Sequence, residues 1–150
     1  MTNFQGSGFS LDIPKDVQDK SVYTFVLPSD ESFTPYITIK FETVPEEHDL
    51  LTYSETNENL LKDNVENFES IDRIAGKHDG KDVAISNAEW GENEGRIHQR
   101  FVYFYDAGEK YQRIYTITCI ALANNFKDCE PYMNHFIKSF KPNENQIFDT

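Results

Sequence analysis

The sequence has little positive charge, few cysteines and no long hydrophobic run. Its 150 residues carry 14 Lys and Arg against 26 Asp and Glu, which gives a formal net charge of −12. Nucleic-acid backbones and anionic lipid surfaces repel a chain of this sign, so neither is expected as its main partner. No apolar stretch is long enough for a transmembrane helix, so we do not expect the chain to be embedded in a membrane.

The N-terminal segment and the cysteines bear on the compartment. Residues 1–11 have neither a basic start nor an apolar stretch, so we expect no secretory signal and a cytoplasmic location. Cys119 and Cys129 are too few for a disulfide framework or a zinc site, and both are expected to be thiols. The four histidines are scattered without ligand spacing, so neither a metal site nor a cofactor is predicted.

Motifs that carry catalysis are also missing. Gly6, Ser7 and Gly8 precede the first predicted strand and so lack the strand-loop-helix context of a phosphate-binding loop. The pairs Glu46/Glu47 and Glu92/Glu94 favour a solvated surface over a general acid and base. We therefore do not expect an enzyme.

Strand patterns fill most of the chain. Alternating and β-branched segments bounded by proline, glycine and asparagine predict seven strands, over residues 9–14, 22–27, 36–42, 71–76, 81–90, 96–106 and 110–122. Helical spacing predicts two helices, over residues 49–67 and 131–138. Residues 142–150 form a polar tail.

The order of these elements predicts the fold class. Strand runs with only one helix between them favour antiparallel pairing, because parallel pairs need crossover connections. We therefore expect one α+β domain over residues 1–150, with a mostly antiparallel twisted sheet of six to seven strands packed with two helices.

Two strands place apolar side chains on both faces. Residues 22–27 put Tyr23, Phe25 and Leu27 on one side and Val22, Thr24 and Val26 on the other. In the strand 96–106, Gln99 lies within an otherwise apolar row, and in the helix 49–67, Asn57, Leu61 and Val65 stack one turn apart. Either helices cover both faces of the sheet, or one face remains for a partner.

Several short segments, in this order and spacing, resemble a known family. They are Phe9-Ser10-Leu11-Asp12-Ile13-Pro14, Gln18 to Pro28, His98-Gln99-Arg100 and Phe136-Ile137-Lys138-Ser139-Phe140. Over residues 4–141 the chain resembles the DcrB-like proteins of the Mog1/PsbP-like fold, and within them it is most similar to the Eag chaperones of bacterial type VI secretion.

The resemblance implies a function and a set of contact residues. It implies a bacterial cytoplasmic homodimer that binds the hydrophobic N-terminal transmembrane helices of a PAAR- or Rhs-type effector and shields them before export. The positions that match the family's partner-binding residues are Val22, Thr24, Ile37, Asn57, Leu61, Val65 and Gln99.

Other functions stay open at this point. Mog1-like relatives regulate small GTPases, so the chain can also be a regulatory adaptor that binds a folded protein partner. An envelope protein of the DcrB type is a further alternative, against which the missing signal and lipid-anchor cysteine argue.

Overall fold

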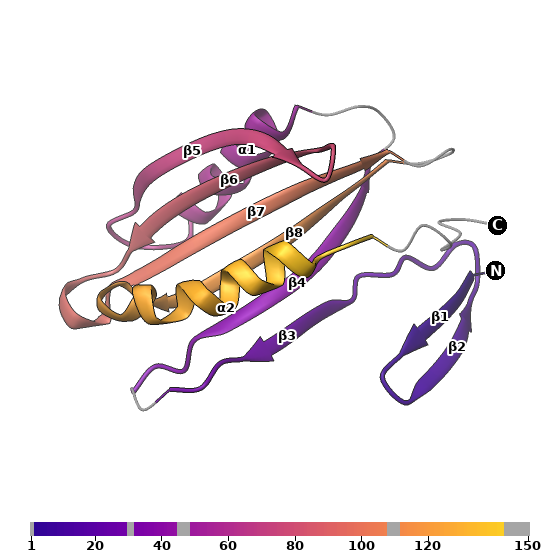
Figure 1. Ribbon diagram of the computed structural model, residues 1–150, viewed down its shortest axis with the longest axis horizontal. Helices are drawn as coiled ribbons and strands as arrows, with labels where there is room; N and C mark the ends of the chain where they lie inside the picture. The colour runs from indigo at the N-terminus through magenta and orange to yellow at the C-terminus, as the bar shows by residue number, and fades with distance from the viewer. Residues whose placement is uncertain (1, 30–31, 45–48, 108–111, 143–150) are drawn as a thin grey trace.

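A long antiparallel hairpin forms the centre of the fold. The computed structural model describes residues 2–29, 32–44, 49–107 and 112–142. Within them, β7 (Ile97–Ala107) and β8 (Gln112–Leu122) pair over their full lengths (Figure 1). Both strands are rich in aromatic and β-branched residues, which fit a pleated surface that is buried on both sides.

Two further strands extend the sheet on each side of this hairpin. β6 (Lys81–Trp90) pairs with β7, and β5 (Glu69–His78) forms the outer edge beyond it. β4 (Tyr36–Val44) pairs with β8, and β3 (Val22–Val26) forms the opposite edge. The order is β3-β4-β8-β7-β6-β5 with every neighbour antiparallel. The predicted α+β class and antiparallel sheet are confirmed.

The two helices pack on opposite faces of the sheet. α1 (Leu50–Lys62) packs over β5, β6 and β7, while α2 (Phe126–Ser139) packs over β8 on the other face (Figure 1). The larger core lies under α2 and includes Phe104, Ile117 and Met133. A smaller core lies under the start of α1 and includes Tyr103 and Ile114.

Both helices differ in length from the sequence prediction. α1 ends at Lys62 rather than at residue 67, because the Asn64 side chain donates to the Leu60 carbonyl at 2.7 Å and closes the last turn. α2 begins at Phe126, five residues before the predicted start at Pro131, directly after the short helix η2 (Ala123–Asn125).

The N-terminal segment forms a hairpin that the sequence prediction recovered only in part. β2 (Phe9–Ile13) is confirmed, and it pairs with an additional strand, β1 (Thr2–Gly6). Gly8 turns the chain at φ 77°, in the left-handed region that favours glycine. A Cβ at Gly6 would lie 2.3 Å from the Phe9 ring, which is 54% exposed and would have to move to admit a larger residue. Figure 1 shows this hairpin apart from the six-stranded sheet, beyond β3.

The remaining predictions concern loops. The segment 91–95, between the predicted strands 81–90 and 96–106, contains the short helix η1 (Asn93–Gly95), and Glu92 and Glu94 are both exposed there. Glu46, Glu47, the turn at 108–111 and residues 143–150 of the predicted tail lie outside the described residues.

Candidate partner-binding surface

α1 lies over β5, β6 and β7, and its start also packs against Val44 at the end of β4 and Ile114 near the start of β8. We call the part of this face beyond α1, over β3, most of β4 and β8 and the start of β7, the open strip. Pairing and alternation place eleven side chains on it. They are Val22, Thr24, Val26, Tyr36, Thr38, Lys40, Gln99, Phe101, Thr116, Thr118 and Ile120.

The strand register arranges these side chains in rows across the sheet. One row is made of threonines, because Thr24 pairs with Thr38, and Thr38 pairs with Thr118. A neighbouring row runs from Val26 on β3 to Gln99 on β7. The open strip is therefore a mixed surface of methyl groups, aromatic rings and hydroxyls.

Exposure changes from the edge of the open strip to its centre. On β3, Val22 is 54% exposed and Val26 is 68% exposed. On β8, Thr116 is 3% exposed and Thr118 is 6% exposed, and Tyr53 of α1 lines the same pocket as Thr116. The open strip is thus recessed along β8 and offers its apolar groups most freely at the β3 edge.

Gln99 is the one carboxamide on the open strip. It is 8% exposed, and its side-chain oxygen accepts a hydrogen bond of 2.7 Å from the indole nitrogen of Trp90. A buried amide needs a partner, and Trp90 supplies one for the oxygen. The Gln99 nitrogen has no hydrogen-bond partner among the described residues.

One side of α1 borders the open strip. Tyr53 donates from its hydroxyl to Glu42 on β4 and packs edge-on against Tyr103 on β7, and Asn57 faces the hydroxyls of both tyrosines. Burial raises the pKa of Tyr53 and of Tyr103 to about 12 each. Both hydroxyls therefore stay protonated at neutral pH. Leu61 follows Asn57 one turn later on this side of the helix.

The structure brings most of the predicted contact residues together. Val22, Thr24 and Gln99 lie on the open strip, and Asn57 and Leu61 lie on the side of α1 that borders it. Whether a partner touches them stays a prediction.

Two predicted contact residues lie elsewhere. Ile37 pairs with Phe25 and Cys119, and all three face α2. It is 0% exposed, so it is a core residue and its assignment to the contact surface is wrong. Val65 is half-buried in the segment after α1, because the helix ends before it and the predicted stack with Leu61 is broken.

The sequence prediction missed several residues of this surface. Thr38, Thr118 and Trp90 gave no signal by themselves, because only the register places the threonines in one row and Trp90 beside Gln99. Alternation within residues 36–42 did place Thr38 on the side opposite Ile37.

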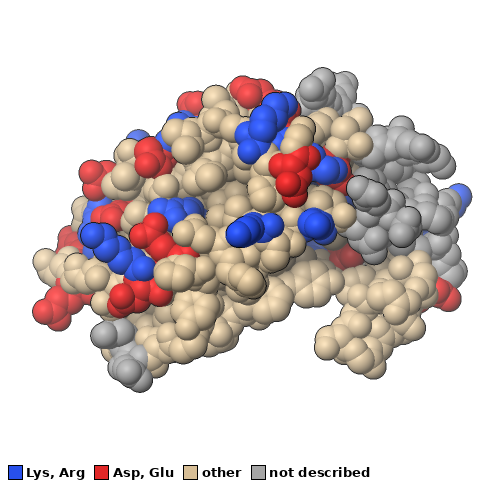
Figure 2. Space-filling view, in the orientation of Figure 1, with Lys and Arg blue, Asp and Glu red and all other residues tan. Residues whose placement is uncertain are grey.

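Charged side chains gather away from this part of the molecule. Of the eleven residues on the open strip only Lys40 is charged, and the exposed Glu42 follows it on the same face of β4 at the border with α1. On the α2 face, Figure 2 shows charged side chains mainly over the β5 and β6 half, whereas the region over β3 is largely free of them. The β3 edge is thus the less charged half of the sheet.

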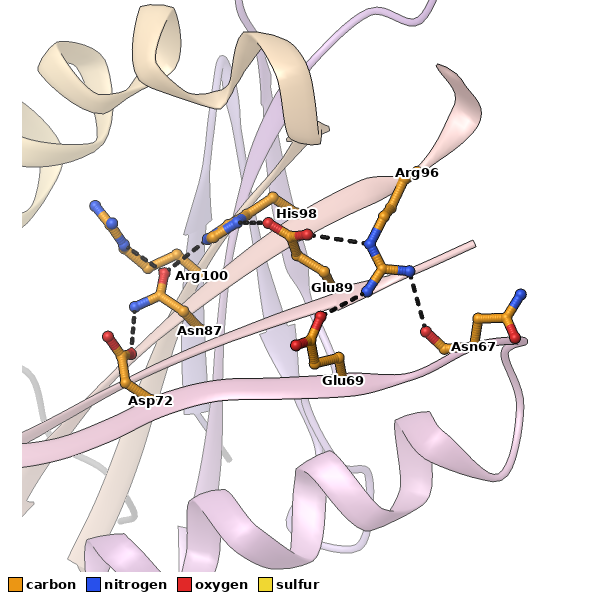
Figure 3. A network of polar contacts seen from close by, with 8 residues as sticks. All are labelled: Asn67, Glu69, Asp72, Asn87, Glu89, Arg96, His98 and Arg100. Carbon is orange, nitrogen blue, oxygen red and sulfur yellow. Dashed lines mark hydrogen bonds and ion pairs between the residues drawn. The ribbon is translucent and has the colours of Figure 1, made fainter. Parts of the chain in front are cut away.

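A polar network on the α2 face is the other conspicuous cluster (Figure 3). His98 lies between Glu89 and Asn87 at 2.9 Å from each, and Arg100 contacts both Asn87 and Glu130. The Arg96 guanidinium donates hydrogen bonds to the carboxylates of Glu89 and Glu69 and to the backbone carbonyls at residues 67 and 91.

The polar network has a structural role, because its contacts hold neighbouring elements of the fold together. The contacts join β5, β6, β7 and the first turns of α2. Among the described residues no group of three His, Cys, Asp or Glu side chains could hold a metal ion.

The two cysteines are free and buried in the core under α2. Burial raises the pKa of the Cys119 thiol to about 12, and it also raises the pKa of Cys129. Both are inert thiols at neutral pH, as the sequence predicted.

A comparison of the sequence with known families matches the DcrB family over residues 9–138. The chain belongs to the DcrB family. Among curated proteins there is no sequence match. The match includes β2, the whole six-stranded sheet and all but the last residue of α2, so it covers the open strip and the helix that borders it.

Three bacterial proteins are among the solved structures with the same fold. PA94 of Pseudomonas aeruginosa, a protein of unknown function and candidate regulator, is 17% identical, with a TM-score of 0.74 over 95% of this DcrB-family chain and 97% of its own. LpqN of Mycobacterium tuberculosis, involved in cell envelope biogenesis, is 12% identical, with a TM-score of 0.58 over 79% of this chain and 82% of its own. Cyanobacterial PsbP from Synechocystis is 10% identical, with a TM-score of 0.53 over 89% and 99%.

These likenesses confirm the PsbP-like fold of this DcrB-family protein. At such low identities they show the fold alone. No helix in the described part of the chain is long and apolar enough to cross a bilayer.

Proposed function

We propose that this DcrB-family protein is a cytoplasmic chaperone that binds the N-terminal transmembrane helices of a type VI secretion effector of the PAAR or Rhs class. It shields those helices from water until export, and it does so without catalysis. The observation that carries the proposal is the open strip, an uncovered and nearly uncharged sheet face that combines exposed apolar groups with a buried amide.

The chemistry of the open strip suits a transmembrane helix. Such helices pack against one another through close van der Waals contact and through Ser, Thr, Asn and Gln side chains that form hydrogen bonds between helices. Thr24, Thr38, Thr118 and Gln99 offer the same groups in a row-by-row arrangement. A helix that buries about 400 Å² of apolar surface here gains roughly 10 kcal/mol before the entropic cost of binding.

The edge of the sheet supports the proposal that the protein acts as a homodimer. All five residues of β3 are exposed, none is charged, and neither proline nor a bulge blocks the strand. An apolar edge strand without such protection is a template for pairing with another strand. Two copies joined at β3 would double the area of the open strip.

The proposal is tested by capture of the effector with variants of the tagged protein in detergent-free extracts. Val22→Asp places a charge on the open strip at an exposed position, so we expect loss of capture with the fold retained. The matched control is Ile74→Asp. Ile74 is 59% exposed and lies on β5 on the face opposite the open strip, so this variant should leave capture unchanged. Gln99→Ala should also abolish capture.

Mass spectrometry of the captured protein decides between the two main functions. Recovery of an effector through a hydrophobic N-terminal segment supports the chaperone. Recovery of a folded partner without such a segment, equally with wild type and Val22→Asp, contradicts it and favours the regulatory adaptor.

A further inference from the structure

The geometry of Trp90 and Gln99 points to a rule of selection on the open strip. This inference rests on the proposed function, because it concerns the chemistry of the helix that the open strip binds. It begins from a single hydrogen bond between β6 and β7.

The bond fixes which end of the Gln99 carboxamide is used. The indole N–H of Trp90 only donates, so the group 2.7 Å away must be the carboxamide oxygen. The NH2 end then faces away from Trp90, and it has no hydrogen-bond partner among the described residues. Gln99 therefore has two unused donors, while its oxygen already accepts a hydrogen bond from Trp90.

The position of Gln99 makes these donors consequential. The residue is 8% exposed, so water reaches it poorly, and a partner that covers the open strip removes the remaining water. A donor that is buried without an acceptor costs about 1–3 kcal/mol. The covering partner must then supply an acceptor or lose affinity.

We infer that Trp90 is a positioning residue, which holds Gln99 as a hydrogen-bond donor so that the open strip selects helices with a free backbone carbonyl. In an intact helix the carbonyls are paired within the helix. Proline removes one N–H and frees the carbonyl four residues earlier, and transmembrane helices tolerate such breaks. A broken apolar helix is thus a better occupant than a continuous one.

Two synthetic peptides test this selection. Both are 20-residue Leu/Ala helices with lysines at each end, and they differ at one central residue, Pro in one and Ala in the other. We expect wild type to bind the Pro peptide about fivefold more tightly, the worth of one added hydrogen bond. Binding is measured by fluorescence anisotropy of labelled peptides.

Two variants isolate the role of Trp90. Trp90→Phe keeps the ring but removes the N–H that orients the carboxamide, and Gln99→Glu keeps the acceptor for Trp90 but removes both donors. Trp90→Phe should bind the Ala peptide as tightly as wild type does and should lose the preference for the Pro peptide. Gln99→Glu also places a charge on the open strip, so it should weaken the binding of both peptides and show no preference. Ile71→Leu, on the exposed edge strand β5, is the control that should keep the preference.

The outcomes separate this inference from the proposed function. If wild type binds neither peptide, the proposed function fails and the selection rule fails with it. If wild type binds both but shows no preference, or if Trp90→Phe retains the full preference, only the selection rule is overturned. If Trp90→Phe binds both peptides equally more weakly than wild type and unfolds at a lower temperature, Trp90 has only a structural role and the inference is wrong.

Discussion

At the scale of single residues, the clearest lesson comes from amides within apolar rows. The sequence indicated that Gln99 needs a partner, and the structure supplies Trp90. The sequence could not indicate which residue is the partner, because the β6–β7 register brings Trp90 and Gln99 together. Asn57 repeats the point, since the tyrosines that it faces come from its own helix and from β7.

Ile37 shows where the reasoning from sequence fails. Alternation separated Ile37 from Thr38, but alternation does not say which of two apolar faces a helix covers. The α2 face takes Ile37 into the core, and Val22 and Thr24 stay on the other side. The positions taken from the family resemblance thus divide between the two faces.

Glu89 gives a prediction on acid stability. Burial raises the pKa of Glu89, but hydrogen bonds and charge from His98 and Arg96 lower it more, and the net pKa lies below its ordinary value of 4.5. Folding therefore favours the charged form, and this contribution is complete above that ordinary value and is lost as the pH falls below it. Glu89→Gln should lower the unfolding temperature at neutral pH and flatten its decline between about pH 5 and about pH 3.

Thermal unfolding across this pH range, followed by circular dichroism, checks the prediction for Glu89. Glu94→Gln, at an exposed position in η1, should behave as wild type. Parallel acid declines for wild type and Glu89→Gln would show that the network contributes nothing through Glu89.

At the scale of elements, the sequence predicted the positions of the strands more accurately than the ends of the helices. Alternation and runs of β-branched and aromatic residues located all six strands of the main sheet, including the edge strands β3 and β5, whose side chains are mostly exposed. Helix ends depend on local capping, and the apolar spacing that continues to Phe68 hid the end of α1 at Lys62. The polar segment TNFQG of β1 carries no strand pattern and is ordered only by its pairing with β2.

α2 is the element on which the larger core depends. Met133 is 0% exposed under this helix, so Met133→Ala should lower the free energy of unfolding by about 2–5 kcal/mol. Tyr132→Ala removes a neighbour that is 44% exposed and should change it by less than about 0.5 kcal/mol. Urea denaturation measures both, and equal losses would mean that α2 does not pack as described.

The β3 edge gives the prediction on assembly. Tyr23 is 43% exposed on the α2 face of β3, so Tyr23→Lys adds a charge to the edge without altering the open strip. We expect wild type to be a dimer in light scattering at micromolar concentration and Tyr23→Lys to be a monomer. Ile71→Lys, on the opposite edge strand, should remain dimeric. A monomeric wild type would contradict the proposed dimer.

At the scale of the whole molecule, charge and apolar surface are kept apart. The formal charge of −12 is compatible with keeping a complex with apolar helices in solution, because like charges repel one complex from another. The open strip contributes one charge of its own, from Lys40.

The most direct test of the proposed function is site-specific cross-linking in the native cell. A photoreactive phenylalanine derivative replaces Val22 in one variant and Ile74 in the other, two similarly exposed positions on opposite faces of the sheet. We expect cross-links from position 22, and not from position 74, to an apolar segment of about 20 residues near the N-terminus of one effector. Cross-links of equal yield from both positions, or from position 22 to a folded domain without such a segment, would contradict it.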